Sequence, residues 1–354
     1  MNSSAPAPAQ SEMRALTAIR FFAALWVVLY HFRDQLAFRI DDSTLIFANG
    51  PLGVDFFFVL SGFVMAHVYS EAVRTGTFDY RSFLRKRFAR LYPLHLATLL
   101  ALVLLASAMA YAGLAPNNAV KYDWSQLPWH LLLIHAWGVT DQLSWNIPSW
   151  SISAEFAAYL LFPLLMAAQL RVGRGIGVAV AAIVLIAIWL ATVAVTGIDL
   201  TRLQEWGVIR IIPEFFLGIA LWRVRPGRQP LILIAAIVAL LLLLHFGAPR
   251  FAAFVLLTVL VWSASAFDAP RWLVYLGEAS YSLYMIHAIV QTVAFNAIDR
   301  IMPSQSSAMS LALVGGVTLL CVLLSIVSYE MIEKPARKWL TRGVKSRPTG
   351  PASQ

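Results

Sequence analysis

Long runs of apolar residues, interrupted by short polar segments, recur along almost the whole chain. A helix of about 20 apolar residues spans the hydrocarbon core of a bilayer, because each residue adds about 1.5 Å. Ten runs approach this length, and they predict an all-α polytopic membrane protein with about ten transmembrane helices. The predicted spans are 15–36, 51–69, 88–112, 149–168, 175–196, 207–222, 230–246, 251–267, 276–297 and 307–330.

Composition favours the same class of protein. Of the 354 residues, 60% are hydrophobic and 13% are charged, and the mean hydropathy is +0.72. A soluble domain carries about 25% charged residues. The excess of apolar residues therefore requires lipid around the protein.

The net charge of +9 would favour nucleic-acid binding in a soluble protein. Here most lysines and arginines fall in the loops on the same side as the N-terminus, if each predicted span crosses once. Because cytoplasmic loops are enriched in these residues, both termini are predicted to be cytoplasmic. The orientation of the protein in the membrane accounts for the excess of positive charge, so we expect no nucleic-acid partner.

These features predict three parts of the chain. Residues 1–12 are rich in serine, alanine and proline and are expected to be a disordered tail. Residues 13–340 form the transmembrane domain, and 341–354 form a cytoplasmic C-terminal tail. Residues 127–137 are too short to cross a membrane, which favours an interfacial or re-entrant helix. The single cysteine, Cys321, excludes an internal disulfide and a cysteine-based metal site, and no metal is expected.

Ionisable residues inside predicted spans are costly and are candidates for function. Arg20 and His31 are eleven residues apart in the first span, which places both on one helix face with about 16 Å between them along the axis. Arg20 lies toward the cytoplasm and His31 toward the outside. The bland alternative is a snorkelling arginine and a structural histidine.

Carboxylates occur at a depth similar to that of His31. Asp55 lies near the outer end of the second span, and Glu155 lies inside the fourth. A carboxylate beside a histidine fixes its tautomer and raises its basicity, so either residue could orient His31 as a general base. Asp34 is a rival partner for His31. Glu214 is four residues from Arg210, and these two residues are expected to pair.

A basic cluster precedes the third span at the cytoplasmic face. Arg87 and Arg90 share one helix face, and paired guanidinium groups suit phosphate binding. Arg85 and Lys86 could join them or could simply set the topology.

Other features are weaker indicators. Gly53, Ser61 and Gly62 permit close helix contact. Tyr281, Tyr284 and His287 share a face that could line a pocket or pack against a helix. A further set of histidines has no evident partners and is interpreted as interfacial or structural: His67, His95, His130, His135 and His245.

Seven motifs in order resemble the bacterial acyltransferase-3 family of integral-membrane O-acyltransferases. They run from about Leu16 to Leu340 and read LTAIRFFAALWVVLYHF, GVDFFFVLSGFVM, FLRKRFARLYPLH, SWSISAEF, PEFFLGIALWR, GEASYSLYMIHA and YEMIEKPARKW. The resemblance implies a multi-pass protein of the bacterial cytoplasmic (inner) membrane. It also implies transfer of an acyl group, most often acetyl, from cytoplasmic acyl-CoA to a hydroxyl of a surface or secreted glycan, free or lipid-linked.

The resemblance extends to individual residues. Arg20 and His31 match the arginine and histidine of the family's first-span motif, and Arg87 and Arg90 match its R-x-x-R motif. Asp55 and Glu155 match acidic positions. Some members carry a fused SGNH hydrolase-like domain. No such domain is seen in this sequence, so a second transfer step, if one is required, would need a separate partner.

In the expected mechanism, the phosphates of coenzyme A bind near Arg87, Arg90 and Arg85. Arg20 extends the positively charged path, and His31 acts as general base. Asp55 or Glu155 would orient His31. Direct transfer is favoured over an acyl-enzyme, because no serine or cysteine has an obvious activating base. Membrane lipid is the expected surrounding, and an oligomer is compatible with the sequence. The alternatives are a small-molecule acceptor such as a macrolide, or a proton-coupled transporter.

Overall fold

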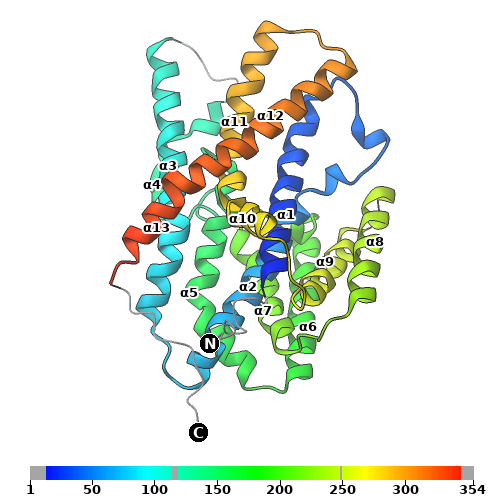
Figure 1. The fold of residues 1–354 in the computed structure, drawn as a ribbon. Coiled ribbons are helices and arrows are strands. Elements are labelled where there is room, and N and C mark those ends of the chain that lie inside the picture. Colours follow the sequence, from blue (N-terminus) through cyan, green and yellow to red (C-terminus); the bar gives the residue numbers. More distant parts are fainter. Residues whose placement is uncertain (1–12, 114–118, 248, 344–354) are drawn as a thin grey trace, which may run out of the picture.

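The computed structural model describes residues 13–113, 119–247 and 249–343. The predicted disordered tail at 1–12 and most of the predicted tail at 341–354 lie outside these ranges. Every regular element within them is helical (Figure 1). The α-helices are α1 (Arg14–Phe32), α2 (Leu52–Arg74), α3 (Tyr80–Tyr111), α4 (Leu127–Leu131), α5 (Trp150–Leu170), α6 (Arg174–Thr196), α7 (Gly207–Arg223), α8 (Pro230–Phe246), α9 (Arg250–Ala264), α10 (Arg271–Glu278), α11 (Ser280–Ile301), α12 (Ser307–Ser328) and α13 (Lys334–Leu340).

Short tight turns complete the connections. Single 3₁₀ turns occur at Arg33–Gln35, Ile40–Asp42, Phe47–Asn49, Ala119–Tyr122, Trp124–Gln126, Ile147–Ser149 and Leu200–Arg202. A π-helical turn at Tyr329–Glu333, called η9, joins α12 to α13. A π turn holds one extra residue and therefore changes which side chains face inward.

Each of the ten predicted spans coincides with a helix, but the helices differ in length. Six segments in the described part of the chain are long and apolar enough to cross a membrane, and a seventh is gained if α10 and α11, bent by 52°, count as one. The helices α7, α8 and α9 have 17, 17 and 15 residues, or roughly 25 Å at 1.5 Å per residue. The structure therefore supports a multi-pass membrane protein. Judged by helix length and composition, the number of spans among the described residues is lower than the predicted ten.

The predicted helix at 127–137 is shorter than expected. It is confined to the five residues of α4, after which the chain turns.

The helix α2 lies at the centre of the bundle and packs against α1, α5, α7 and α9. Its predicted small residues allow this. A Cβ atom on Gly62 would overlap the carbonyl oxygen of Phe215 in α7, and one on Gly218 would overlap that of Val59 in α2. Gly53 makes a similar approach to Ala23 of α1. The expected close helix contacts at Gly53 and Gly62 are confirmed.

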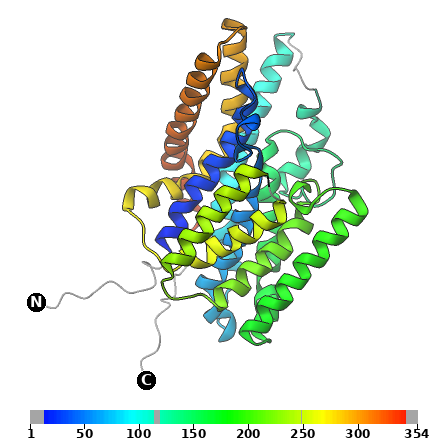
Figure 2. The same cartoon turned by 90° about the vertical axis from the view of Figure 1, so that its right-hand side faces the viewer.

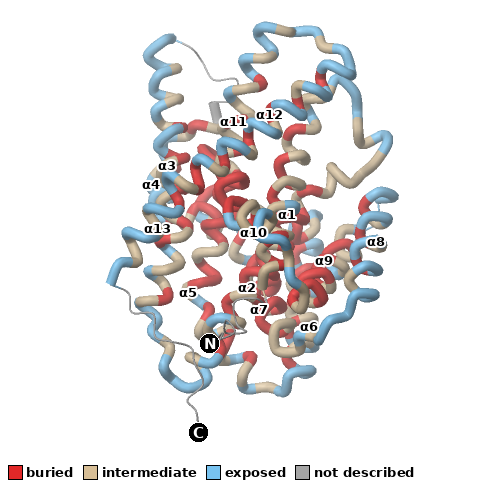
Figure 3. The backbone as a smooth tube through the Cα atoms, viewed as in Figure 1, coloured by how far each residue is buried: buried red, intermediate tan, exposed pale blue. Residues whose placement is uncertain are grey.

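Buried residues gather around α2, α5 and α7, while exposed residues cover α8, α13 and the upper part of α3 (Figure 3). Turning the molecule by 90° shows α12 and α6 on opposite sides of this centre (Figure 2). Many exposed side chains on the outer helices are large and apolar, including Leu104, Ile183, Leu231 and Leu319. A lipid-facing surface explains this pattern, because the hydrocarbon core replaces water there.

Three histidines that the sequence left without partners form a stack. The ring of His130 lies 3.9 Å from that of His135 and 6.5 Å from that of His95, centroid to centroid, with nearly parallel planes. Nε2 of His95 lies 2.8 Å from the carbonyl oxygen of His130. The stack fastens the segment around α4 to α3, and all three rings are buried.

We expect acid to destabilise this segment. Burial, and then the neighbouring His95, lower the pKa of His130 from 6.5 to about 3, so between these values the unfolded chain binds a proton that the folded chain excludes. The folded state is therefore favoured above about pH 6.5 and loses stability as the pH falls. The melting temperature in detergent should drop between about pH 7 and pH 5, and the drop should be smaller in His130→Gln than in His245→Gln, an exposed control. Equal drops in the two variants would contradict this account.

Candidate active site

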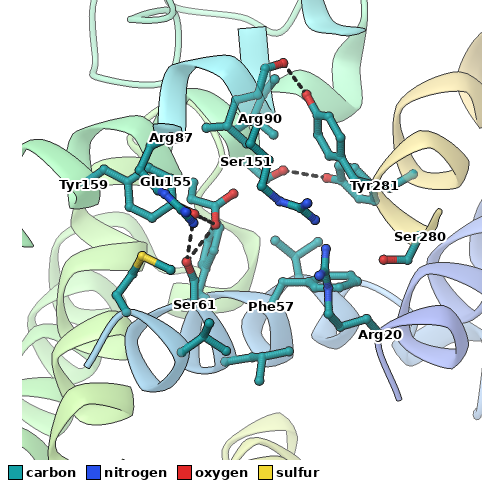
Figure 4. A pocket seen from close by; sticks show the side chains of 18 residues that line it. Arg20, Phe57, Ser61, Arg87, Arg90, Ser151, Glu155, Tyr159, Ser280 and Tyr281 are labelled. Carbon is teal, nitrogen blue, oxygen red and sulfur yellow. Dashed lines mark hydrogen bonds between the residues drawn. The ribbon is translucent and has the colours of Figure 1, made fainter. Parts of the chain in front are cut away.

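A cavity of about 120 Å³ opens between α1, α2, α3, α5 and α11. Arg20 of α1 and both Arg87 and Arg90 of α3 point into it, together with Glu155 of α5 (Figure 4). Four of the predicted site residues, from three separate helices, thus share one chamber. Aromatic and apolar residues of α2 and α11, among them Phe57 and Tyr281, form much of its remaining wall.

The cavity holds guanidinium groups with unused hydrogen-bond donors. Nε of Arg87 and Nη2 of Arg90 are buried and have no partner among the described residues. An unsatisfied donor of a charged group is expensive to bury. These donors, beside Arg20, have the chemistry that an anionic group such as a phosphate requires.

Glu333 holds Arg90 in place from the opposite side. Its Oε1 lies 3.5 Å from Nη1 of Arg90, and its Oε2 accepts a hydrogen bond from Ser282 at 3.0 Å. Glu333 is almost fully buried and ends the π-helical turn η9. The extra residue of that turn places Glu333 inward while its neighbour Glu330 stays at the surface with Lys334.

Glu155 makes hydrogen bonds at the wall of the cavity. Its Oε1 accepts from Ser61 at 2.7 Å and from Tyr159 at 2.6 Å. The two hydroxyl oxygens are 3.2 Å apart. Ser61 thus has a carboxylate partner, and the expectation that no serine has such a base was wrong.

Asp55 forms a buried ion pair with Arg210 of α7. Nε and Nη2 of Arg210 donate to its two oxygens at 2.9 and 2.8 Å, and neither residue is exposed. Glu214 lies 3.9 Å from Nε of Arg210, so the expected pair on α7 is present. The guanidinium group also lies 5.0 Å from the ring centroid of Trp150. Asp55 therefore ties α2 to α7, and its oxygens are occupied by Arg210.

His31 lies apart from the residues that line the cavity. Its ring packs against Tyr30 and against His287 of α11, with centroid distances of 4.9 and 5.0 Å. Asp34 forms an ion pair with Arg33 at 3.7 Å. Among the described residues, neither Asp55 nor Glu155 is bonded to His31. Arg20 and His31 thus occupy two separate places along α1.

Arg85 also lies apart from the cavity lining. It is exposed and donates to the carbonyl oxygens of Leu340, the last residue of α13, and of Arg342 at 2.6 and 3.0 Å.

The chain belongs to the acyltransferase-3 family, since residues 13–330 match the family model described as an acyltransferase domain. It is 38% identical to the acyltransferase MdmB of Streptomyces mycarofaciens over 44% of this chain and 40% of that protein. It is 24% identical to a putative O-acetyltransferase of Staphylococcus aureus over 95% of this chain and 59% of that protein. The O-acetyltransferase OatA of Staphylococcus aureus is 26% identical over 43% of this chain and 24% of its own length. The chain therefore spans less than two thirds of each of these relatives. No solved structure matches it significantly.

The sequence did not single out Tyr159 and Glu333, which bond to Glu155 and Arg90, and it did not predict the ion pairs between distant helices. The partners Asp55 and Arg210 are 155 positions apart, and Arg90 and Glu333 are 243 apart. Glu333 stands in the quoted YEMIEKP motif, and that motif was the available signal.

We expect Asp55→Ala to destabilise the fold. Arg210 would remain fully buried with the more distant Glu214 and the carbonyl oxygen of Pro51, and removing one partner of a buried pair costs about 3–5 kcal/mol. The melting temperature in detergent should fall by several degrees. The control is Asp268→Ala, whose exposed pair with Arg14 is worth about 0–1 kcal/mol. Equal shifts in the two variants would show that the buried pair contributes nothing.

Proposed function

We propose that this chain is a membrane O-acyltransferase that moves an acyl group, acetyl by preference, from cytoplasmic acyl-CoA to a hydroxyl group of a glycan. The observation that carries the proposal is the convergence of Arg20, Arg87 and Arg90 on one cavity with unused N–H donors. Family membership supports acyl transfer, and relatives named O-acetyltransferase support acetyl as the group.

The donor would bind through its phosphates at Arg87 and Arg90. Guanidinium groups bind phosphate oxygens through two parallel hydrogen bonds, and the free donors of both residues suit this use. Glu333 would keep Arg90 aimed at the cavity, and Arg20 would extend the positive surface along α1. Arg85 would contribute less, because carbonyl oxygens already occupy it.

The acceptor would react at His31. His31 lies about 16 Å from Arg20 along α1, and the long, thin pantetheine arm of coenzyme A can cover this distance. His31 would take the proton of the attacking hydroxyl as its oxygen bonds to the thioester carbonyl carbon. The carbon–sulfur bond then breaks, and the proton passes to the thiolate, giving an ester and a free thiol.

Direct transfer remains our preferred route. The hydrogen bond between Ser61 and Glu155 supplies what a serine nucleophile requires, so an acyl-enzyme on Ser61 is the competing route. Glu155 serves either route at the donor end of the path, where it fixes Ser61 and Tyr159.

The proposed location is the bacterial inner membrane, with ten crossings and both termini cytoplasmic. Contacts between connecting segments support alternating helix directions. Arg14 at the start of α1 pairs with Asp268 before α10, and His245 at the end of α8 contacts Thr44 in the α1–α2 connection. Short helices such as α8 and α9 would cross where neighbouring helices allow a thinner bilayer.

His31→Ala should abolish product, because the group that takes the hydroxyl proton is removed. The measurement is mass spectrometry of O-acetyl esters on the glycans of cells that carry the wild-type or variant gene. Expression and membrane insertion should be unchanged, as a blot of the membrane fraction would check. Normal ester content in the variant would end the assignment of His31 as base.

Replacing both Arg87 and Arg90 by alanine should weaken acetyl-CoA binding by about 10- to 100-fold, because two charge-assisted contacts to phosphate are lost. Isothermal titration of the purified protein measures the dissociation constant. Arg81→Ala, on the exposed first turn of the same helix, is the matched control and should bind as wild type does. An unchanged dissociation constant in the double variant would refute the phosphate role.

A further inference from the structure

The group beside the His31 ring is a second imidazole, that of His287 in α11. The two ring centroids are 5.0 Å apart, and the ring planes are tilted by 36°. The carboxylates expected to orient His31 are bonded elsewhere, Asp55 to Arg210 and Glu155 to Ser61. His287 is therefore the available partner for His31 inside the bundle.

Hydrogen bonding defines which nitrogen of His287 carries a proton. Its Nδ1 lies 2.6 Å from the carbonyl oxygen of Tyr284. A carbonyl oxygen can only accept, so Nδ1 carries the hydrogen and the Nε2 of the neutral ring is a bare acceptor. The residue is fully buried, and Nε2 has no partner among the described residues. An unpaired buried acceptor is costly unless a donor reaches it.

The helix α11 also holds the main chain of His31. Gln291, one turn beyond His287, donates from Nε2 to the carbonyl oxygen of His31 at 2.8 Å. This bond fixes α1 against α11 at the level of the two rings. The χ2 angle of histidine has a broad energy well, so the His31 ring is free to turn while its main chain stays fixed.

Charged groups around the pair come from three segments. Arg33 and Asp34 follow the end of α1, and Lys121 reaches Thr292 of α11 with a hydrogen bond of 2.8 Å. Asp34 is paired with Arg33, and Asp41 binds Arg33 as well. No carboxylate is bonded to either imidazole among the residues that the structure describes. A neutral acceptor is the kind of partner that remains.

We propose that His287 is the positioning residue of His31: its Nε2 accepts a hydrogen bond from a ring N–H of His31. The other nitrogen of His31 then faces the acceptor as a free base. When His31 takes the hydroxyl proton, the bond to His287 holds the N–H of the imidazolium until the proton leaves for the thiolate. This role is the one that a carboxylate fills in many histidine bases, and the inference rests on the proposed function.

The test compares His287→Ala, His287→Asn and His287→Gln in membranes of the source cells supplied with acetyl-CoA at varied concentration. Esters formed on the endogenous glycan give an apparent kcat and the KM for acetyl-CoA. The alanine and asparagine variants should lose about 10- to 100-fold in kcat with KM unchanged. The glutamine variant should stay within about tenfold of wild type, because its amide oxygen can take the place of Nε2.

Two comparisons separate positioning from a structural role. At equal amounts in the membrane, His287→Gln should be more active than His287→Asn, since only the longer amide takes the place of Nε2. His245→Ala, an exposed histidine at the end of α8, should match wild type. If His287→Ala fails to insert, His287→Asn serves instead, since its amide can still donate to the carbonyl of Tyr284.

The outcomes distinguish the two levels of the proposal. An active His31→Ala would overturn the proposed base itself. An inactive His31→Ala together with wild-type kcat in His287→Ala or His287→Asn would overturn only the positioning role. Glutamine as harmful as alanine, or a raised KM at constant kcat, would also overturn it.

Discussion

The ion pair between Asp55 and Arg210 is the interaction on which the rest of the bundle depends. It joins α2 to α7 where Gly62 and Gly218 let the two backbones touch, and both side chains are fully buried. In a medium without water such charges are tolerated only with partners. The pair therefore fixes the register of α2 against α7, and about two turns further along, α2 presents Ser61 to Glu155 of α5.

The same rule explains where function can lie. Both oxygens of Asp55 and both oxygens of Glu333 have partners. Among the described residues, the buried atoms without a hydrogen bond include donors of Arg87 and Arg90 and Nε2 of His287. They also include Nη1 of Arg210, both carboxylate oxygens of Glu214 and Nδ1 of each stacked histidine. Unpaired polar atoms in an apolar bundle are costly, so those at the cavity and beside His31 are candidates for bonding to a ligand or a moving proton. The two ends of the proposed acyl path are both such places.

The bend of the chain at two points gives the site its shape. The π-helical turn η9 directs Glu333 toward Arg90, while the 52° bend between α10 and α11 sets Ser280 and Tyr281 at the cavity wall. The helix α11 then continues past Tyr284 to His287 and Gln291, which meet His31. One helix thus lines the cavity at its start and contacts the proposed base, His31, further along.

The sequence by itself determined where the main helices lie: each of the ten apolar runs coincides with a helix, because hydropathy along the chain is a local property. It also selected Arg20, Arg87, Arg90 and Glu155, which the fold brings into one cavity. Only the tertiary structure decided the pairings. Asp55 was expected near His31 and pairs with Arg210 instead. Partners 155 residues apart are brought together by helix packing and not by their spacing along the chain. His287 came to His31 in the same way, since two helices that meet in space leave no mark in the sequence of either.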